Sequence, residues 1–164
     1  MTRGAKIANR IERTVTGPMW HGPALYDLLD GVPQQRAAAH PLAGAHSIWE
    51  IVCHVTAWAE IARRRAGGEK VEPTPAEDWP PVQDEGGDGW AHAVERLAVA
   101  HSELAALTRT LDDQQLDALT PGQEYSVAIM LNGVVEHGTY HGGQIALLKK
   151  AGLGTRDSGL GTRD

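Results

Sequence analysis

Four stretches of the chain repeat apolar residues at three- and four-residue steps, the spacing of a helix that buries one face. They run approximately over residues 20–33, 47–66, 88–111 and 127–150. The last is the longest, with its apolar stripe at Val127, Leu131, Val134, Ile145 and Leu148. A weaker pattern over residues 2–16 indicates a short leading helix. The sequence therefore predicts an all-α fold built as a four-helix bundle.

Capping residues mark the ends of these helices. Ser47 and Glu50 fit a capping box, in which the serine hydroxyl accepts from the Glu50 amide and the Glu50 carboxylate accepts from the Ser47 amide. Gly67 is placed to end the same helix, Asp88 to cap the third and Ser126 to cap the fourth. The helix boundaries are therefore predicted independently of the apolar stripes.

Two connections differ in length. Residues 34–46 are predicted to form a loop. Residues 67–89 contain four prolines and many acidic residues, which predicts a long connection without secondary structure. About twenty extended residues can travel back along a helix of about 30 Å, so the third helix can run parallel to the second. The pattern favours a bundle with a long crossover between its second and third helices.

By length, 164 residues form one domain, which is large enough to bury a core without disulfides. We expect this domain to cover residues 1–151. The sequence Gly-Leu-Gly-Thr-Arg-Asp then occurs twice within residues 152–164. Its glycine content and short length predict a flexible C-terminal tail.

Composition and charge argue against several kinds of partner and of cellular location. A net charge of −6 argues against a nucleic-acid partner, which requires clustered Lys and Arg. The only basic run, residues 63–65, is interpreted as a solvated helix end. Cys53 is the single cysteine, so it excludes an internal disulfide and is interpreted as a small core residue. No stretch resembles a signal peptide or reaches the roughly 20 apolar residues that span a bilayer, so we expect a cytoplasmic protein without a membrane partner.

Two histidines lie four residues apart on the longest helix. His141 falls on its apolar stripe and His137 borders it, so both imidazoles can point to one spot, as two ligands of a divalent metal would. Spacing alone also fits two hydrogen-bonded structural histidines. Gly138, Gly142 and Gly143 surround the pair, and because each weakens a helix by about 1 kcal/mol, they indicate a close approach there. Gly138 also replaces the glutamate of the HExxH motif, which argues against a zinc protease of that type.

Histidines on two other helices are candidates for a third ligand. His54 lies on the apolar face of the second helix, between Ile51 and Trp58. His101 borders the apolar face of the third helix and is the rival of His54. Each also fits a core histidine satisfied by hydrogen bonds, so spacing leaves the choice open.

Several segments together resemble the DinB/YfiT-like family of metal-binding helical bundles. The resemblance extends over roughly residues 5–150, and the pattern HxxYHxGQI is its most specific part. It is carried by Trp20-His21-Gly22-Pro23, by residues 47–54 with Trp58, by Trp79-Pro80-Pro81 and by residues 136–145.

This resemblance implies that His54, His137 and His141 form a three-histidine site for a divalent metal, typically Zn²⁺ or Ni²⁺. It also implies an up-down-down-up bundle that is commonly a homodimer. Some relatives transfer low-molecular-weight thiols or isomerise thiol adducts. Gly138 stands where family members often carry Asp, which leaves open whether an acid supports the site in this chain.

Three imidazoles leave at least one coordination position of a metal free for water or a thiolate. The leading hypothesis is therefore a metal-dependent enzyme of thiol-transferase type, or a hydrolase, that acts on a small-molecule substrate. The alternative is a non-catalytic dimer that binds a metal or a ligand. Four further residues are candidates for contacts to the ligands or the substrate: His21, Glu136, Tyr140 and Gln144.

Overall fold

The computed structural model describes residues 1–83 and 86–151. Within these ranges it contains eight helices and no strand, which confirms the predicted all-α class. The four long helices are α1 (Arg3–Thr16), α4 (Ile48–Ala66), α6 (Gly89–Thr110) and α8 (Val127–Ala151). The four short helices are α2 (Leu25–Leu29), α3 (Gln34–Ala38), α5 (Pro75–Asp78) and α7 (Asp113–Asp117). The predicted tail, residues 152–164, lies outside the described residues.

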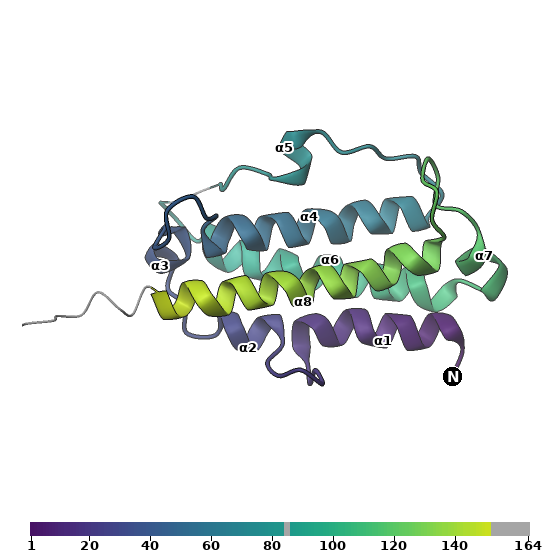
Figure 1. Cartoon of the computed structure of the whole chain (residues 1–164), viewed down its shortest axis with the longest axis horizontal. Helices are drawn as coiled ribbons and strands as arrows, with labels where there is room; N and C mark the ends of the chain where they lie inside the picture. Colours follow the sequence, from purple (N-terminus) through teal and green to yellow (C-terminus); the bar gives the residue numbers. More distant parts are fainter. Residues whose placement is uncertain (84–85, 152–164) are drawn as a thin grey trace, which may run out of the picture.

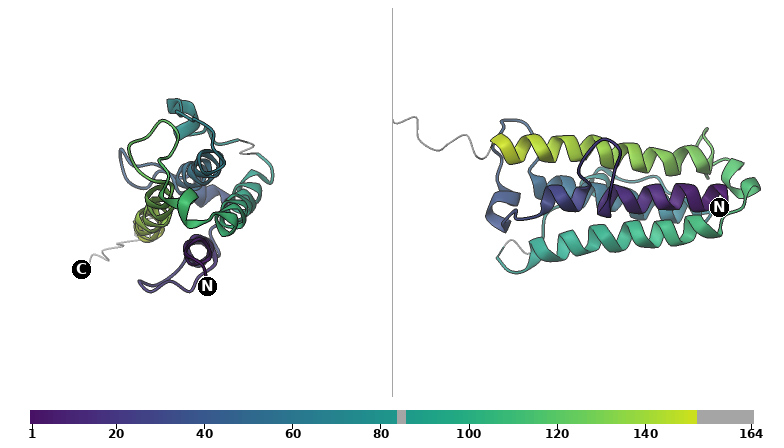
Figure 2. Two further views of the ribbon diagram at one scale, coloured as in Figure 1. Left: turned by 90° about the vertical axis from the view of Figure 1, so that its right-hand side faces the viewer. Right: turned by 90° about the horizontal axis from the view of Figure 1, so that it is seen from below.

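The long helices lie side by side along the length of the molecule (Figures 1 and 2). Helix α1 packs against α6 and α8, and α4 packs against the same two helices. Figure 1 shows α1 and α8 running in one direction and α4 and α6 in the other. The chain leaves α4 and returns along its outer side through α5 before α6 begins, so part of this connection covers α4.

In the N-terminal half, the helix expected over residues 2–16 is confirmed, and two other expectations were wrong. The weak pattern over residues 2–16 is the long helix α1, because Ile7, Ile11 and Val15 are all buried against its neighbours. The stretch expected to form a longer helix after Trp20 contains only the five residues of α2, and Gly31 then takes a positive φ of 67° that interrupts any continuation. The predicted loop over residues 34–46 includes α3.

The connection after α4 also holds an element that was not expected. Thr74 and Glu77 form a capping box, with the Thr74 amide donating to Glu77 Oε2 at 2.8 Å and the Glu77 amide to Thr74 Oγ1 at 3.3 Å. Pro75 occupies the first turn, where its missing N–H costs nothing. Helix α5 is therefore locally encoded although it is only four residues long.

The predicted caps of two long helices are confirmed. The Ser47 amide donates to Glu50 Oε2 at 2.7 Å, and the Glu50 amide donates to Ser47 Oγ at 3.1 Å. Ser126 Oγ accepts from the Ile129 amide at 3.3 Å. Asp88 precedes α6 as predicted, but its side chain makes no capping hydrogen bond.

Two clusters of buried apolar side chains fill the space between the helices. One includes Ile11 and Leu131, and the other includes Trp49, Leu97 and Ile145. No helix in the described part of the chain is both long and apolar enough to cross a membrane.

Glycines let α8 approach α1 and α2 closely. A Cβ built on Gly138 would lie 2.5 Å from Thr14 Cγ2, and one on Gly142 would lie 3.3 Å from Leu28 Cδ1. The close approach predicted from these glycines is therefore found at both positions. At Gly143 the prediction is wrong, because a Cβ there would meet no atom within 4 Å.

Candidate metal centre

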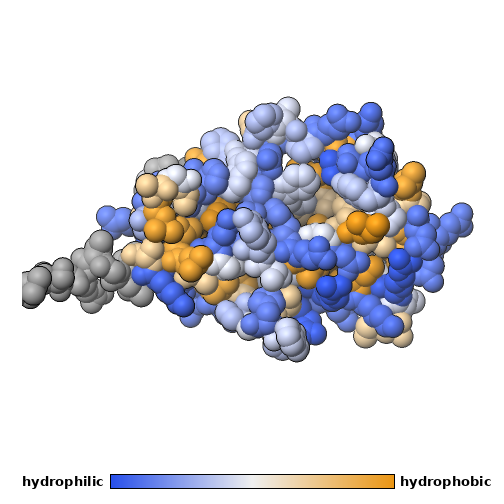
Figure 3. All heavy atoms as spheres, in the orientation of Figure 1, coloured by the Kyte–Doolittle hydropathy of each residue, from blue (hydrophilic) through white to orange (hydrophobic). Residues whose placement is uncertain are grey.

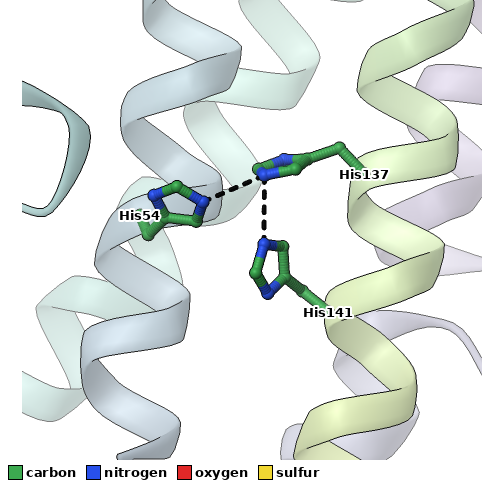
Figure 4. Close-up of side chains that lie close together, drawn as sticks. All are labelled: His54, His137 and His141. Carbon is green, nitrogen blue, oxygen red and sulfur yellow. Dashed lines mark hydrogen bonds between the residues drawn. The ribbon is translucent and has the colours of Figure 1, made fainter. Parts of the chain in front are cut away.

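Three imidazoles from two helices meet in the space between α4 and α8 (Figure 4). His137 Nε2 lies 3.0 Å from His54 Nε2 and 3.0 Å from His141 Nε2. His54 and His141 are buried, and His137 is half-buried. Among the described residues, these three make up the one group of at least three His, Cys, Asp or Glu side chains placed to hold a metal ion.

Hydrogen bonds fix the protons of the two outer imidazoles. His54 Nδ1 lies 2.6 Å from the backbone oxygen of Asp78, and His141 Nδ1 lies 2.6 Å from Gln144 Oε1. Because both oxygens can only accept, both Nδ1 atoms carry the proton, and in neutral rings each Nε2 is left with a lone pair. Gln144 is oriented in turn, since its Nε2 donates to the Tyr140 hydroxyl at 3.2 Å.

The central imidazole cannot satisfy both of its neighbours. His137 Nε2 offers at most one proton, but it faces lone pairs on His54 and on His141. One proton cannot make two well-aligned hydrogen bonds, so at least one of the two 3.0 Å contacts lacks a hydrogen bond of its own. A cation between the three nitrogens removes this conflict. Tetrahedral Zn²⁺, with Zn–N bonds of about 2.0–2.1 Å, would hold its ligands roughly 3.3 Å apart, so the donor set fits such an ion.

The surroundings keep the imidazoles neutral. Burial lowers the pKa of His54 and of His141. Burial and repulsion by the two neighbouring rings together lower the pKa of His137 to about 4. At neutral pH the three rings are therefore in the form that binds a metal.

The connection after α4 supplies supports that the sequence did not reveal as part of the site. Trp79 stacks on His54, with ring centroids 3.9 Å apart and planes at 6°, and on His46 at 3.6 Å and 11°. Asp78 Oδ1 lies 3.3 Å from His54 Nδ1 and accepts from Trp58 Nε1 at 2.6 Å. Trp79 belongs to one of the motifs shared with the family, which is the signal that could have found it. Asp78 carries no such signal beyond its place beside Trp79.

The four additional candidates separate into two groups. Gln144 contacts His141 directly, and Tyr140 acts through Gln144. Exposed His21 lines a groove with Gly142 on another side of α8, and Glu136 lines a separate surface pocket with Trp20. Among the described residues, no contact joins either His21 or Glu136 to the three imidazoles.

His101, the rival third ligand, lies outside the group. It is buried, its Nδ1 donates to the Leu97 oxygen at 2.8 Å, and burial lowers its pKa to about 4. Its Nε2 has no hydrogen-bond partner among the described residues. Of the two, only His54 lies beside His137 and His141, and its role as a metal ligand stays a prediction.

Two cavities reach the imidazoles from opposite directions. One, of about 430 Å³, is lined by His54 and His137 together with Trp58. The other, of about 560 Å³, is lined by His54 and His141 together with Trp79. Both volumes lie in the range of small-molecule sites, so a ligand can approach the three nitrogens.

A model of the family described as the DinB superfamily matches residues 20–145. The chain belongs to the DinB superfamily. The DinB match spans all three imidazoles and begins after α1, so the family resemblance identified from the motifs is confirmed. No curated protein and no solved structure matches the chain.

Proposed function

We propose that this DinB-superfamily protein is a metal-dependent enzyme that transfers or hydrolyses a small thiol-containing substrate, with Zn²⁺ or Ni²⁺ held by His54, His137 and His141. The observation that carries the proposal is the conflict at His137 Nε2, which faces two lone pairs with at most one proton. Neutral rings with oriented Nδ1 protons form a donor set suited to a divalent cation.

An ion in this position would supply a Lewis acid with a free coordination position, which lowers the pKa of a bound thiol or water. The protein's own groups prepare the site for it. The Asp78 carbonyl and Gln144 Oε1 hold two rings in the required tautomer. Trp79 covers one face of His54 and shields it from water. The open cavities beside the rings favour a substrate site over a closed structural one.

The test combines metal analysis with a screen for thiol conjugation. We expect one metal ion per chain, and its loss in His54→Ala, His137→Ala and His141→Ala. His92→Ala is the control, because this histidine is exposed on α6. Full metal content in the His54 variant would refute the three-histidine assignment. Metal binding without turnover on any thiol pair would favour the non-catalytic binder.

We infer in addition that the long helices form the family's up-down-down-up bundle with a crossover between α4 and α6. The support is the direction of the helices and the path of the connection through α5 (Figure 1). Limited proteolysis followed by sequencing tests this order. Cleavage within the connection should leave α4 and α6 associated, and dissociation of the fragments would contradict it.

We also infer a homodimer, which the family resemblance favours. Large apolar side chains are exposed around Tyr140, with Trp20 99% and Leu147 63% exposed. Figure 3 shows hydrophobic residues gathered near the C-terminal end of α8. Light scattering should give twice the chain mass of 17.6 kDa, and Leu147→Glu should lower it. A monomer at micromolar concentration would contradict the dimer.

A further inference from the structure

A buried arginine stands at the end of α4. The basic run over residues 63–65 was expected to be solvated, and for Arg65 this is wrong, because only 4% of it is exposed. Its Nε and one terminal nitrogen donate to the Val71 oxygen at 3.0 and 2.7 Å, and its other terminal nitrogen donates to the Tyr125 hydroxyl at 3.2 Å. Arg64, by contrast, pairs with Glu69 at the surface.

Within the described part of the chain, no acidic side chain pairs with the charge of Arg65. Both of its partners are neutral, and no carboxylate lies within 4.0 Å of its nitrogens among the described residues. A buried charge is normally paired, because desolvation penalises an isolated ion strongly. A guanidinium carries five N–H groups, so each terminal nitrogen of Arg65 keeps one N–H for a further acceptor.

Arg65 shares a cavity with the candidate metal centre. His54, Trp58 and Arg65 lie on one face of α4, at i, i+4 and i+11, and all three line the cavity of about 430 Å³. The guanidinium carbon lies 5.7 Å and the His54 ring centre 6.5 Å from the centre of the Trp58 ring, so at most about 12 Å separates the two ends. The wall between the two ends is apolar and comes mainly from Ala62, Ile129, Met130 and Val134.

The two ends of this cavity differ in charge. Asp78 lines the histidine end, where it contacts His54 and Trp58. The guanidinium carbon of Arg65 lies 5.7 Å from the centre of the Trp58 ring. A ligand carboxylate would be repelled by Asp78 and attracted by Arg65, so the field across Trp58 orients an anionic ligand.

We propose that this cavity binds a small carboxylate with an apolar body. The carboxylate accepts hydrogen bonds from Arg65, the body lies against Trp58 and the apolar wall, and the far end points toward the three histidines. Only the role of the far end as the reacting part rests on the proposed function. Charge-assisted hydrogen bonds to a guanidinium are the strong contacts for such a ligand, and they define its class.

The probes are octanoate and octanol, which share one chain and differ in charge, together with octylamine. Calorimetry on the full chain measures their binding, both as purified and after EDTA. We expect octanoate to bind at least about tenfold more tightly than octanol, with or without EDTA, and octylamine to bind most weakly. Arg65→Met should raise the octanoate Kd about tenfold or more and leave the octanol Kd unchanged, and Arg65→Lys should retain part of the preference.

Further outcomes separate this proposal from a purely structural role of Arg65 and from the metal site. Equal affinity of the unmodified protein for octanoate and octanol would overturn the proposal without any variant. Loss of octanoate binding on EDTA treatment would also overturn it, because the carboxylate would then bind the metal. Ile129→Trp fills the cavity from an exposed position and should weaken both octanoate and octanol. Because metal content is measured separately, failure of either proposal leaves the other intact.

Discussion

The backbone oxygen of Asp78 lies 2.6 Å from Nδ1 of His54, so a residue of the connection fixes the proton of a residue on α4. No side-chain substitution removes a carbonyl, which protects this ring from most mutations at position 78. His141 is held by the same kind of contact, but from the side chain of Gln144. Of the two supports, the one at His141 can therefore be removed by mutation.

Gln144→Leu should lower metal affinity about 10- to 100-fold, because it removes the acceptor that holds the His141 ring. Competition against a chelating dye measures the change. Tyr140→Phe is the matched control, since it removes only the hydroxyl that accepts from Gln144 Nε2 and leaves the contact between Gln144 and His141 in place. Equal affinities in Gln144→Leu and the unmodified protein would show that the contact does not support a metal ligand.

Removal of the metal should destabilise the fold. An ion bound only to the native state adds about 2.7 kcal/mol at a hundredfold excess over its Kd, and for a chain of this size each kcal/mol corresponds to roughly 2–4 °C in Tm. We therefore expect EDTA at pH 7.5 to lower the Tm by several degrees and added Zn²⁺ or Ni²⁺ to restore it. His54→Ala should respond to neither addition. An unchanged Tm after proven loss of metal would contradict the site.

Buried His101 should make stability depend on pH below 6.5. Burial lowers its pKa from 6.5 to about 4, so between these values the unfolded chain binds more protons than the native one. Its contribution is fully present above pH 6.5 and is lost as pH falls toward 4. In urea unfolding with EDTA, the loss of stability from pH 7 to pH 5 should be about 2 kcal/mol smaller in His101→Leu.

Exposed His92 provides the control for this measurement. His92→Leu should retain the pH dependence of the unmodified protein, because its ring is solvated in both states. The same pH dependence in both leucine variants would mean that His101 titrates normally.

Gly138→Ala should destabilise the fold by about 1–3 kcal/mol, because its methyl group would overlap Thr14 Cγ2. Thr14→Ser removes that carbon, keeps the hydroxyl and should rescue the double variant. At Gly143 there is open space, so Gly143→Ala should instead stabilise α8 by up to about 1 kcal/mol. Denaturant unfolding measures all four proteins. Equal effects of the two alanines would show that the contact with α1 does not limit position 138.

Local geometry determined which parts of the site could be predicted. His137 and His141 follow from helical periodicity, because a four-residue step is a property of one helix. Spacing left His54 and His101 undecided, since their choice depends on how two helices pack. Spacing could not predict the position of Trp79 either, because the connection that positions it lacks any periodic pattern.

Helical phase also accounts for the burial of Arg65 and of α1. Arg65 lies eleven residues after His54, which places it on the same face of α4, whereas the charge run alone suggested a solvated end. For α1, the narrow stripe of Ile7, Ile11 and Val15 understated how much of the helix is buried, because Ala8 and Gly4 also face its neighbours. Small residues such as these can line a buried helix face without adding to its apolar pattern in the sequence.

The stacking of Trp79 on His54 has an optical consequence. Indole emission is sensitive to any group within a few ångströms, and here one indole rests 3.9 Å from a candidate ligand of the metal. Trp58 lies 6.0 Å from the His137 ring, so a second fluorophore stands beside the same three nitrogens. Paramagnetic Ni²⁺ would quench this emission, whereas closed-shell Zn²⁺ would shift it without that loss. Tryptophan emission would thus report which ion the three imidazoles bind.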